Sequence, residues 1–294
     1  MARVIAVFGP TASGKTAAAL ELAGSLGGEI VNCDAMQLYA GLPVLTNQPS
    51  AAELSLVPHH LVGIWPLDHE GSVAEYGGLA RAAIADIHGR GRDAVVVGGS
   101  GLYLRAALAP LDLPPQPRPG DRERFAQLYD SQGAGAAHAL LTSRDPAAAT
   151  AVHPNDRRRV VRALELAEMG ASLAPAEGSL WSEPPDGTVI LGLEVPADDL
   201  RRRIAERTRA MFDRGVEDEV ATALRGATLS ATAARIHGLQ DVRALLAGEI
   251  DREEAIRRLD LRTRQYAKRQ RVWMRRLPGL RPVSPESVLE AVGP

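Results

Sequence analysis

The chain has 294 residues, 45% of them hydrophobic, and its 34 basic and 36 acidic residues give a formal net charge of −2. That length suits a core with an insertion or two domains, and the near balance of charge excludes binding to nucleic acid through overall charge alone. No apolar run approaches the about 20 residues that a membrane span needs. Because Cys33 is the only cysteine, no internal disulfide is possible. We expect a cytoplasmic protein without membrane contact, and nothing in the sequence demands more than a monomer.

The first recognisable motif follows a short apolar run at residues 3–8. It matches the G-x-x-x-x-G-K-[ST] pattern of a P-loop, and the alanine-rich stretch at 17–23 favours a helix after it. A strand, a glycine-rich loop and a helix in this order direct backbone N–H groups at phosphate oxygens. Lys15 would add a point charge, and the Thr16 hydroxyl would hold Mg²⁺. The predicted di- or triphosphate site consists of Gly9, Pro10, Thr11, Ala12, Ser13, Gly14, Lys15 and Thr16.

Three further apolar runs, at residues 29–33, 94–97 and 188–195, predict strands. Continuous apolar strands that alternate with helices favour a parallel α/β sheet, in which ligands bind at the carboxyl ends of the strands. Asp34 and Ser100 follow two of these ends, as the P-loop follows the first. We therefore predict one site at this edge of a P-loop NTPase-like parallel sheet flanked by helices.

Loose, proline-rich stretches divide the chain. Residues 113–120 are typical of a stiff linker, and the sequence after them is helical and loop-rich up to about residue 186. We predict a core whose first part spans residues 1–112, a mainly helical insertion domain at 113–186, and a last part at 187–294 that completes the core and ends in helices.

Arg207 stands out on a predicted helix, where it shares one face with Leu200, Ile204 and Met211. A buried charge without a partner is costly, so this guanidinium should have one. A structural salt bridge, or a side chain that reaches out to solvent, would also satisfy it.

Basic residues gather in two other helical segments. In the insertion, residues 154–156 are a helix-start signal, and Arg158 and Arg162 then share a face with Arg159 beside them. That pattern alone is more typical of a solvated surface. Residues 261–281 hold eight Lys and Arg and no acid, which fits a polyanion better. The stripe expected to dock this last helix on the core is Ile256, Leu259, Tyr266, Trp273 and Leu277, and the basic strip is Arg262, Arg264, Lys268, Arg269, Arg271, Arg275 and Arg276.

Seven segments, in the same order along the chain, resemble the tRNA dimethylallyltransferase family. They are GPTASGKT at 9–16, CDAMQLY at 33–39, VPHHL at 57–61, VVVGGSGLYL at 95–104, HPNDRRRVVRALE at 153–165, LRRRIAERTRAMFDRGVEDEV at 200–220 and TRQYAKRQRVWMRR at 263–276. The resemblance implies that the N6 amine of the adenosine at position 37, 3′ to the tRNA anticodon, attacks C1 of dimethylallyl diphosphate, and that pyrophosphate leaves. The P-loop would then hold a prenyl diphosphate with Mg²⁺.

The resemblance also implies roles for single residues. Asp34 would be the general base, Arg207 would stabilise the departing pyrophosphate, and Lys15 and Ser100 would complete the catalytic set. Contacts with the tRNA anticodon stem-loop would come from Asp34, Ala35, Met36, Gln37, Arg122, Arg158, Arg159, Arg162, Lys268 and Arg269. The sequence departs from the family pattern at Ala35 and Ser100, where serine and threonine are usual, and at residues 236–241.

Three alternative functions share parts of this pattern. An isopentenyltransferase that acts on a free adenine nucleotide would need the P-loop and Asp34 but neither basic helix. A P-loop small-molecule kinase would need a mobile lid, for which the sequence shows no motif. A tRNA-binding protein that had lost catalysis would not need to retain Lys15, Thr16, Asp34 and Arg207.

Overall fold

A computed structural model describes residues 2–111, 115, 117–118, 120–174 and 182–293. The chain divides into two compact units, Met1–Pro110 with Trp181–Pro294, and Leu111–Leu180. The sequence predicts the second of these units, the insertion, at 113–186. Of its linker at 113–120, residues 113, 114, 116 and 119 lie outside the described residues.

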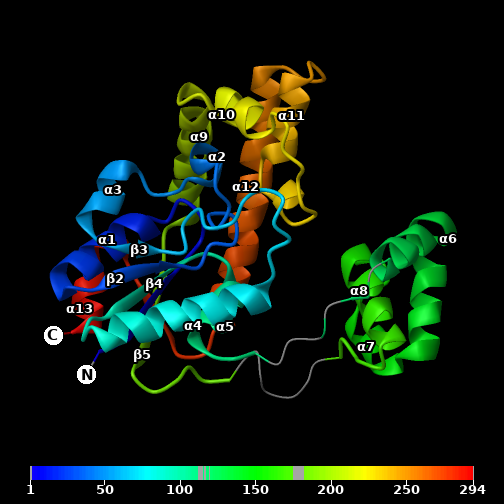
Figure 1. Ribbon diagram of the computed structural model, residues 1–294, viewed down its shortest axis with the longest axis horizontal. Coiled ribbons are helices and arrows are strands. Elements are labelled where there is room, and N and C mark those ends of the chain that lie inside the picture. The colour runs from blue at the N-terminus through cyan, green and yellow to red at the C-terminus, as the bar shows by residue number, and fades with distance from the viewer. Residues whose placement is uncertain (1, 112–114, 116, 119, 175–181, 294) are drawn as a thin grey trace. The chain divides into compact units, whose positions relative to one another are not determined.

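The larger unit is built on a six-stranded sheet in the order β3-β2-β4-β1-β5-β6, and every neighbouring pair of strands is parallel (Figure 1). The strands are β1 (Val4–Phe8), β2 (Glu29–Asn32), β3 (His59–His60), β4 (Ala94–Gly98), β5 (Thr188–Leu193) and β6 (Leu280–Val283). The predicted parallel α/β fold is confirmed, and the four predicted strands end within two residues of the prediction.

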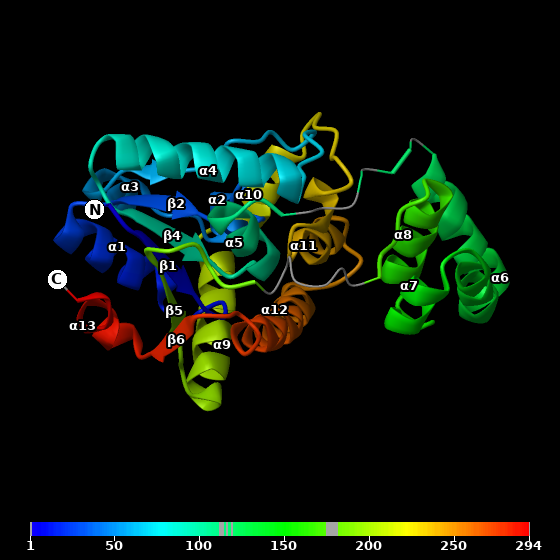
Figure 2. The same ribbon diagram turned by 90° about the horizontal axis from the view of Figure 1, so that it is seen from below.

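Helices cover both faces of the sheet (Figure 2). Helix α1 (Lys15–Leu26) and the short α13 (Val288–Val292) lie on one face, where Leu22 packs with Ile5 and Val7 of the central strand. Helices α4 (Val73–Gly89) and α5 (Gly101–Leu108) lie on the other face. A sheet buried on both faces explains why the strand sequences are continuous apolar runs.

The remaining helices of this unit lie in the segments of the chain that follow β2 and β5. They are α2 (Pro43–Thr46), α3 (Ala51–Leu56), α9 (Ala197–Asp213), α10 (Val216–Ala223), α11 (Leu239–Leu246) and α12 (Arg252–Met274), with 3₁₀ turns at Ala233–Arg235 and Pro285–Ser287. Pro196 is the N-cap of α9, and Asp198 and Asp199 lie in its first turn, where they interact favourably with the helix dipole. No helix among the described residues is long and apolar enough to cross a membrane.

The smaller unit contains three helices, α6 (Asp121–Arg144), α7 (Pro146–Ala151) and α8 (Arg157–Glu168). Helix α6 is kinked at Gly133, whose φ of 85° lies in the left-handed region. Phe125, Leu141 and Leu164 contribute to a hydrophobic core within this unit. The predicted helix start at residues 154–156 is confirmed, since the Asp156 side chain accepts a hydrogen bond from the backbone N–H of Arg159.

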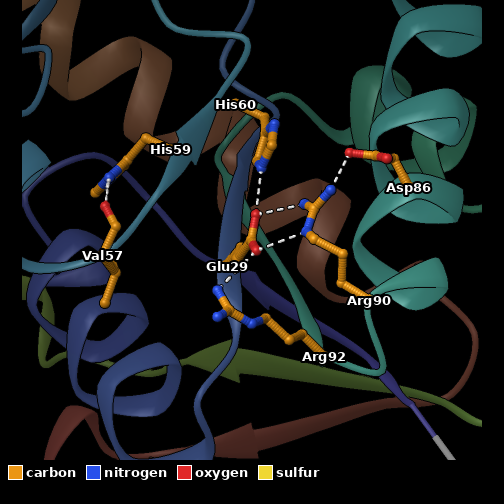
Figure 3. Close-up of polar contacts among 7 residues, drawn as sticks. All are labelled: Glu29, Val57, His59, His60, Asp86, Arg90 and Arg92. Atoms are coloured by element: carbon orange, nitrogen blue, oxygen red, sulfur yellow. Dashed lines mark hydrogen bonds and ion pairs between the residues drawn. The ribbon is translucent and has the colours of Figure 1, made fainter.

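A buried carboxylate anchors the amino end of β2, the end opposite the P-loop edge (Figure 3). Glu29 is 3% exposed and accepts hydrogen bonds from Arg90 at 2.8 Å, Arg92 at 3.0 Å and His60 Nε2 at 2.7 Å. Burial alone would raise its pKa, but the hydrogen bonds from Arg90 and His60 and the Arg90 charge outweigh burial and lower the pKa from 4.5 to about 2. The ionised form of Glu29 therefore stabilises the fold.

Replacing Glu29 by glutamine is expected to destabilise the protein at pH 7 by about 2–3 kcal/mol, since each pKa unit is about 1.4 kcal/mol. Because the folded-state pKa lies below the unfolded one, this contribution is present above pH 4.5 and is lost as the pH falls toward 2. Urea unfolding of both proteins at pH 7 and at pH 3 measures it. An equal difference in unfolding free energy at the two pH values would contradict this account.

Candidate active site

The P-loop connects β1 to α1, and hydrogen bonds within the loop hold its conformation. Gly14 is the N-cap of α1, with a φ of 94° that favours glycine. Lys15 Nζ donates a hydrogen bond to the Pro10 carbonyl oxygen at 2.8 Å, and the Ser13 N–H donates to the same oxygen at 3.2 Å. The loop therefore stands at the start of a helix, where free N–H groups and the positive end of the dipole attract an anion.

A cavity of about 440 Å³ lies at this edge of the sheet. Side chains from the P-loop, from the loop after β2, and from α9 and α12 all line it. The predicted site residues on its wall are Thr11, Ala12, Gly14, Lys15, Thr16, Asp34, Met36, Gln37 and Arg207. The structure thus brings the phosphate loop, the candidate base and the candidate arginine to one volume.

Asp34 is held at the end of β2 by a short turn. Its backbone N–H donates to Asn32 Oδ1 at 2.9 Å, and its Oδ1 accepts from the Met36 N–H at 3.0 Å. One carboxylate oxygen therefore fixes the loop, and the group lies on the cavity wall, partly exposed. A carboxylate oriented in this way can accept a proton from a substrate held in the cavity.

Two cations share the cavity with Asp34. Burial lowers the pKa of Lys15 from 10.5 to about 8, with the Asp34 charge opposing the shift and the Arg207 charge adding to it. Burial also lowers the pKa of Arg207 from 12.5 to about 10, again against the charge of Asp34. Both groups are protonated at pH 7 and would gain from an anion beside them.

Arg207 reaches from α9 to the P-loop, where its Nη2 donates a hydrogen bond to Thr11 Oγ1. Its Nε is buried and has no hydrogen-bond partner within the part of the chain that the structure describes. The partner expected for this guanidinium is therefore only partly present, since its one hydrogen bond is to a neutral hydroxyl.

The Ser100 hydroxyl joins two other segments of the site. It accepts a hydrogen bond from the Ala35 N–H at 3.3 Å and lies 3.3 Å from the Tyr266 hydroxyl. A threonine, usual in the family, would offer the same oxygen, so the substitution retains this contact. The backbone of Ala35 makes the bond, which needs no serine hydroxyl at that position.

Gln37 and Met36 both make contacts with protein groups. Gln37 Nε2 donates to the carbonyl oxygens of Thr46 at 3.3 Å and Asn47 at 2.6 Å, so its Oε1 is the end left for an adenine edge. Met36 Sδ accepts from the His237 N–H at 3.4 Å. Both side chains are held in place by the loops that surround the cavity.

The cavity also contains residues that the sequence analysis did not assign to a site. They are His59, Arg203, His237, Thr263 and Tyr266, among others. Tyr266 was expected to dock α12 on the core, and His237 lies in the segment that departs from the family pattern. Burial, with the charges of Arg269, Arg262 and Arg207, lowers the pKa of His237 to about 4, so its ring is neutral at pH 7.

In the smaller unit, the arginines expected to contact tRNA fall into two pairs. Arg122 and Arg162 both form ion pairs with the buried Glu165, at 3.1 Å and 2.9 Å. Arg158 and Arg159 are exposed, and neither side chain has an ion-pair partner among the residues described for this unit. Of the four, these two are available to a polyanion.

Both the buried face and the basic face of helix α12 differ from the prediction. Its buried residues are Ala255, Leu259, Thr263, Ala267 and Gln270, while Ile256, Tyr266 and Trp273 are only half-buried. The basic strip is partly neutralised from elsewhere in the chain, because Arg262 pairs with Asp241 at 3.0 Å and Arg264 with Asp260 at 2.6 Å. Lys268 and Arg269 are exposed.

Comparisons with known proteins find family models and relatives that match most of the chain. The chain matches the family model described as IPP transferase over residues 37–277 and the one described as isopentenyl transferase over residues 2–61. It is 43% identical over 276 residues to a tRNA dimethylallyltransferase of Corynebacterium jeikeium (strain K411), covering 93% of this chain and 89% of the relative. Over 294 residues it is 43% identical to one of Anaeromyxobacter dehalogenans (strain 2CP-1), covering 99% and 95%.

Two solved structures have folds similar to that of this chain. The full-length tRNA isopentenylpyrophosphate transferase of Bacillus halodurans superposes with a TM-score of 0.72 at 32% identity, covering 99% of this chain and 95% of that one. A eukaryotic dimethylallyltransferase described as acting on tRNA superposes with a TM-score of 0.75 at 25% identity, covering 98% and 75%. The chain therefore belongs to the tRNA dimethylallyltransferase family.

Proposed function

We propose that this protein transfers a dimethylallyl group from dimethylallyl diphosphate to N6 of the adenosine 3′ to the anticodon of tRNA. The observation that carries the proposal is that the P-loop around Lys15 and the carboxylate of Asp34 line one cavity of about 440 Å³. That volume lies within the range of pockets that enclose small-molecule ligands. The exposed Arg158, Arg159, Lys268 and Arg269 would hold the tRNA.

In the proposed reaction, N6 of adenine forms a bond to C1 of the prenyl group while the bond from C1 to the diphosphate oxygen breaks. Pyrophosphate leaves with the electron pair of that bond, and Arg207 and Lys15 stabilise its charge. The attacking nitrogen becomes acidic only as it gains positive charge, and Asp34 then accepts its proton. Gln37 Oε1 would accept a hydrogen bond from the adenine edge.

The cavity wall also fits a magnesium ion as the cofactor. Among the described residues no three His, Cys, Asp or Glu come together as a metal cage. Mg²⁺ commonly takes only one or two protein oxygens and completes its shell with substrate phosphates and water. Thr16 would hold it beside the diphosphate, with Asp34 on the same wall. When bound, the ion would neutralise part of the diphosphate charge.

One assay separates this function from the alternatives. Labelled dimethylallyl diphosphate and Mg²⁺ are incubated with either tRNA or AMP, and the label on each acceptor is counted. Transfer to tRNA is expected. Label on AMP instead would favour the nucleotide prenyltransferase, and ATP-dependent phosphorylation without prenyl transfer would favour the kinase. As part of the same proposal, the protein acts in the cytoplasm as a monomer.

Diphosphate binding by the free enzyme is expected to weaken as the pH rises through 8. Lys15, with its pKa of about 8, is an ammonium below that pH and loses its charge above it, whereas a phosphate ester with a pKa near 6 is already fully ionised. The dissociation constant should therefore rise up to about tenfold per pH unit above 8. Calorimetric titration between pH 7 and 9.5 measures it. A Lys15→Met variant should bind weakly without this pH dependence, and a wild-type profile that is flat would contradict the role of Lys15.

A further inference from the structure

A buried glutamine on α12 links the P-loop to the loop that follows β4. Gln270 is 2% exposed, although it sits between Arg269 and Arg271, which are both exposed. Its Oε1 accepts a hydrogen bond from the Thr11 N–H at 2.7 Å, and its Nε2 donates one to the Gly99 carbonyl oxygen at 3.0 Å. Both ends of one amide thus join segments that are far apart in the sequence.

Close packing sets the position of this amide. A Cβ atom on Gly99 would lie 2.0 Å from Gln270 Nε2, and one on Gly101 would lie 2.3 Å from the Trp273 ring. Side chains of helix α12 therefore lie directly against the backbone of the glycine-rich loop. The Thr11 N–H needs an acceptor and the Gly99 carbonyl needs a donor, and an amide side chain offers both. Neither a carboxylate nor an ammonium does.

The residue that Gln270 holds, Thr11, is also the hydrogen-bond partner of Arg207. Thr11 donates its backbone N–H to Gln270 and accepts a hydrogen bond from Arg207 at its hydroxyl. The Arg207 side chain lines the cavity, and its Nε is buried without a partner among the described residues. From these contacts we infer that Gln270 is a positioning residue, which holds Thr11 so that the Arg207 guanidinium stays at the cavity wall where the diphosphate would bind.

The inference rests on the proposed function, and it gives α12 two separate tasks. Lys268 and Arg269 on the exposed side would contact tRNA, while Gln270 on the buried side serves the diphosphate. A change at Gln270 should then affect one substrate and not the other. A purely structural residue would not separate the two substrates, because an unfolded fraction of enzyme lowers kcat and leaves both KM values unchanged.

The test uses Gln270→Met, which keeps the length of the side chain and removes both hydrogen bonds. We expect KM for dimethylallyl diphosphate to rise about tenfold and KM for tRNA to stay within twofold. Gln265→Met, on the exposed side of the same helix, should match the wild type in both constants. Equal diphosphate KM values in Gln270→Met and the wild type, or a larger change for tRNA than for diphosphate, would overturn the inference.

A double-mutant cycle tests whether Gln270 acts through Arg207. In an Arg207→Gln background the effect of Gln270→Met should shrink from about tenfold to less than threefold. An undiminished effect would mean that Gln270 does not work through Arg207. Binding of inorganic pyrophosphate, followed by calorimetry, gives the same comparison without turnover. A wild-type protein that bound pyrophosphate but transferred no prenyl group would thus contradict the proposed function and leave this test intact.

Discussion

Replacing Asp34 by asparagine is expected to abolish prenyl transfer while leaving diphosphate binding nearly intact. Removing a general base typically costs a factor of about 10²–10⁴ in rate. The loop should keep its shape, because the asparagine Oδ1 can still accept the hydrogen bond that the Met36 N–H gives to Asp34 at 3.0 Å. The amide cannot take a proton from N6. Single-turnover transfer to tRNA, measured at saturating dimethylallyl diphosphate, reports the loss.

The matched control is Asp68→Asn, an exposed carboxylate in the same unit, which should transfer at the wild-type rate. Pyrophosphate binding to Asp34→Asn, measured by calorimetry, should stay within about threefold of the wild type. A transfer rate within tenfold of the wild type would exclude Asp34 as the base. Loss of pyrophosphate binding in parallel with transfer would instead make Asp34 part of the diphosphate or metal site.

Much of the sheet could be predicted because its signal is local. The strands β1, β2, β4 and β5 are largely buried on both faces, so each is a mainly apolar run that ends at a loop, with β2 also carrying the polar Glu29 and Asn32. The outer strands β3 and β6 could not be found in this way. β3 has two half-buried histidines, and β6 contains a proline and exposed side chains, as edge strands often do.

The site was predictable to the extent that single segments carry its chemistry. The P-loop pattern and the positions of Asp34 and Ser100 after strands place them at one edge, and the structure puts Asp34 on the cavity wall that the P-loop also lines. The spacing of residues within a segment could not predict the contacts between segments that are distant in the sequence. Gln270 lies 259 residues from Thr11, and its pairing follows from the docking of α12, which the sequence leaves undetermined.

The arginines show the same limit of prediction from local sequence. Helical spacing put Arg158, Arg159 and Arg162 together, but it could not show that the buried Glu165, three residues after Arg162, neutralises that guanidinium. Likewise, the acids that pair with Arg262 and Arg264 lie outside residues 261–281, so a count within that segment overstated its free charge. A charge pattern in a sequence shows where basic residues lie along the chain and on a helix, whereas the ion pairs that they form depend on the tertiary fold.

Arg207→Gln is expected to lower kcat by about 10²–10³ and to raise KM for dimethylallyl diphosphate about tenfold, with little change in KM for tRNA. The loss of kcat is that typical of removing one well-placed donor to a developing anion. The side chain is half-buried at the cavity, one donor is used on Thr11, and its buried Nε has no acceptor among the described residues. A buried donor without a partner costs about 1–3 kcal/mol. An oxygen of the bound diphosphate would remove part of that cost. The negative charge that develops on the departing pyrophosphate would strengthen the interaction, which favours the transition state over the bound substrate.

Steady-state kinetics with varied dimethylallyl diphosphate and tRNA separates these effects. Arg202→Gln is the control, since Arg202 lies on the solvent side of the same helix and pairs with Asp199 at 3.1 Å and Glu206 at 3.4 Å. It should behave as the wild type. If Arg207→Gln raised KM for dimethylallyl diphosphate and left kcat within fivefold, the arginine would bind the ground state and the transition state equally. The charge of the leaving group would then have to be stabilised by Lys15 and the P-loop N–H groups alone.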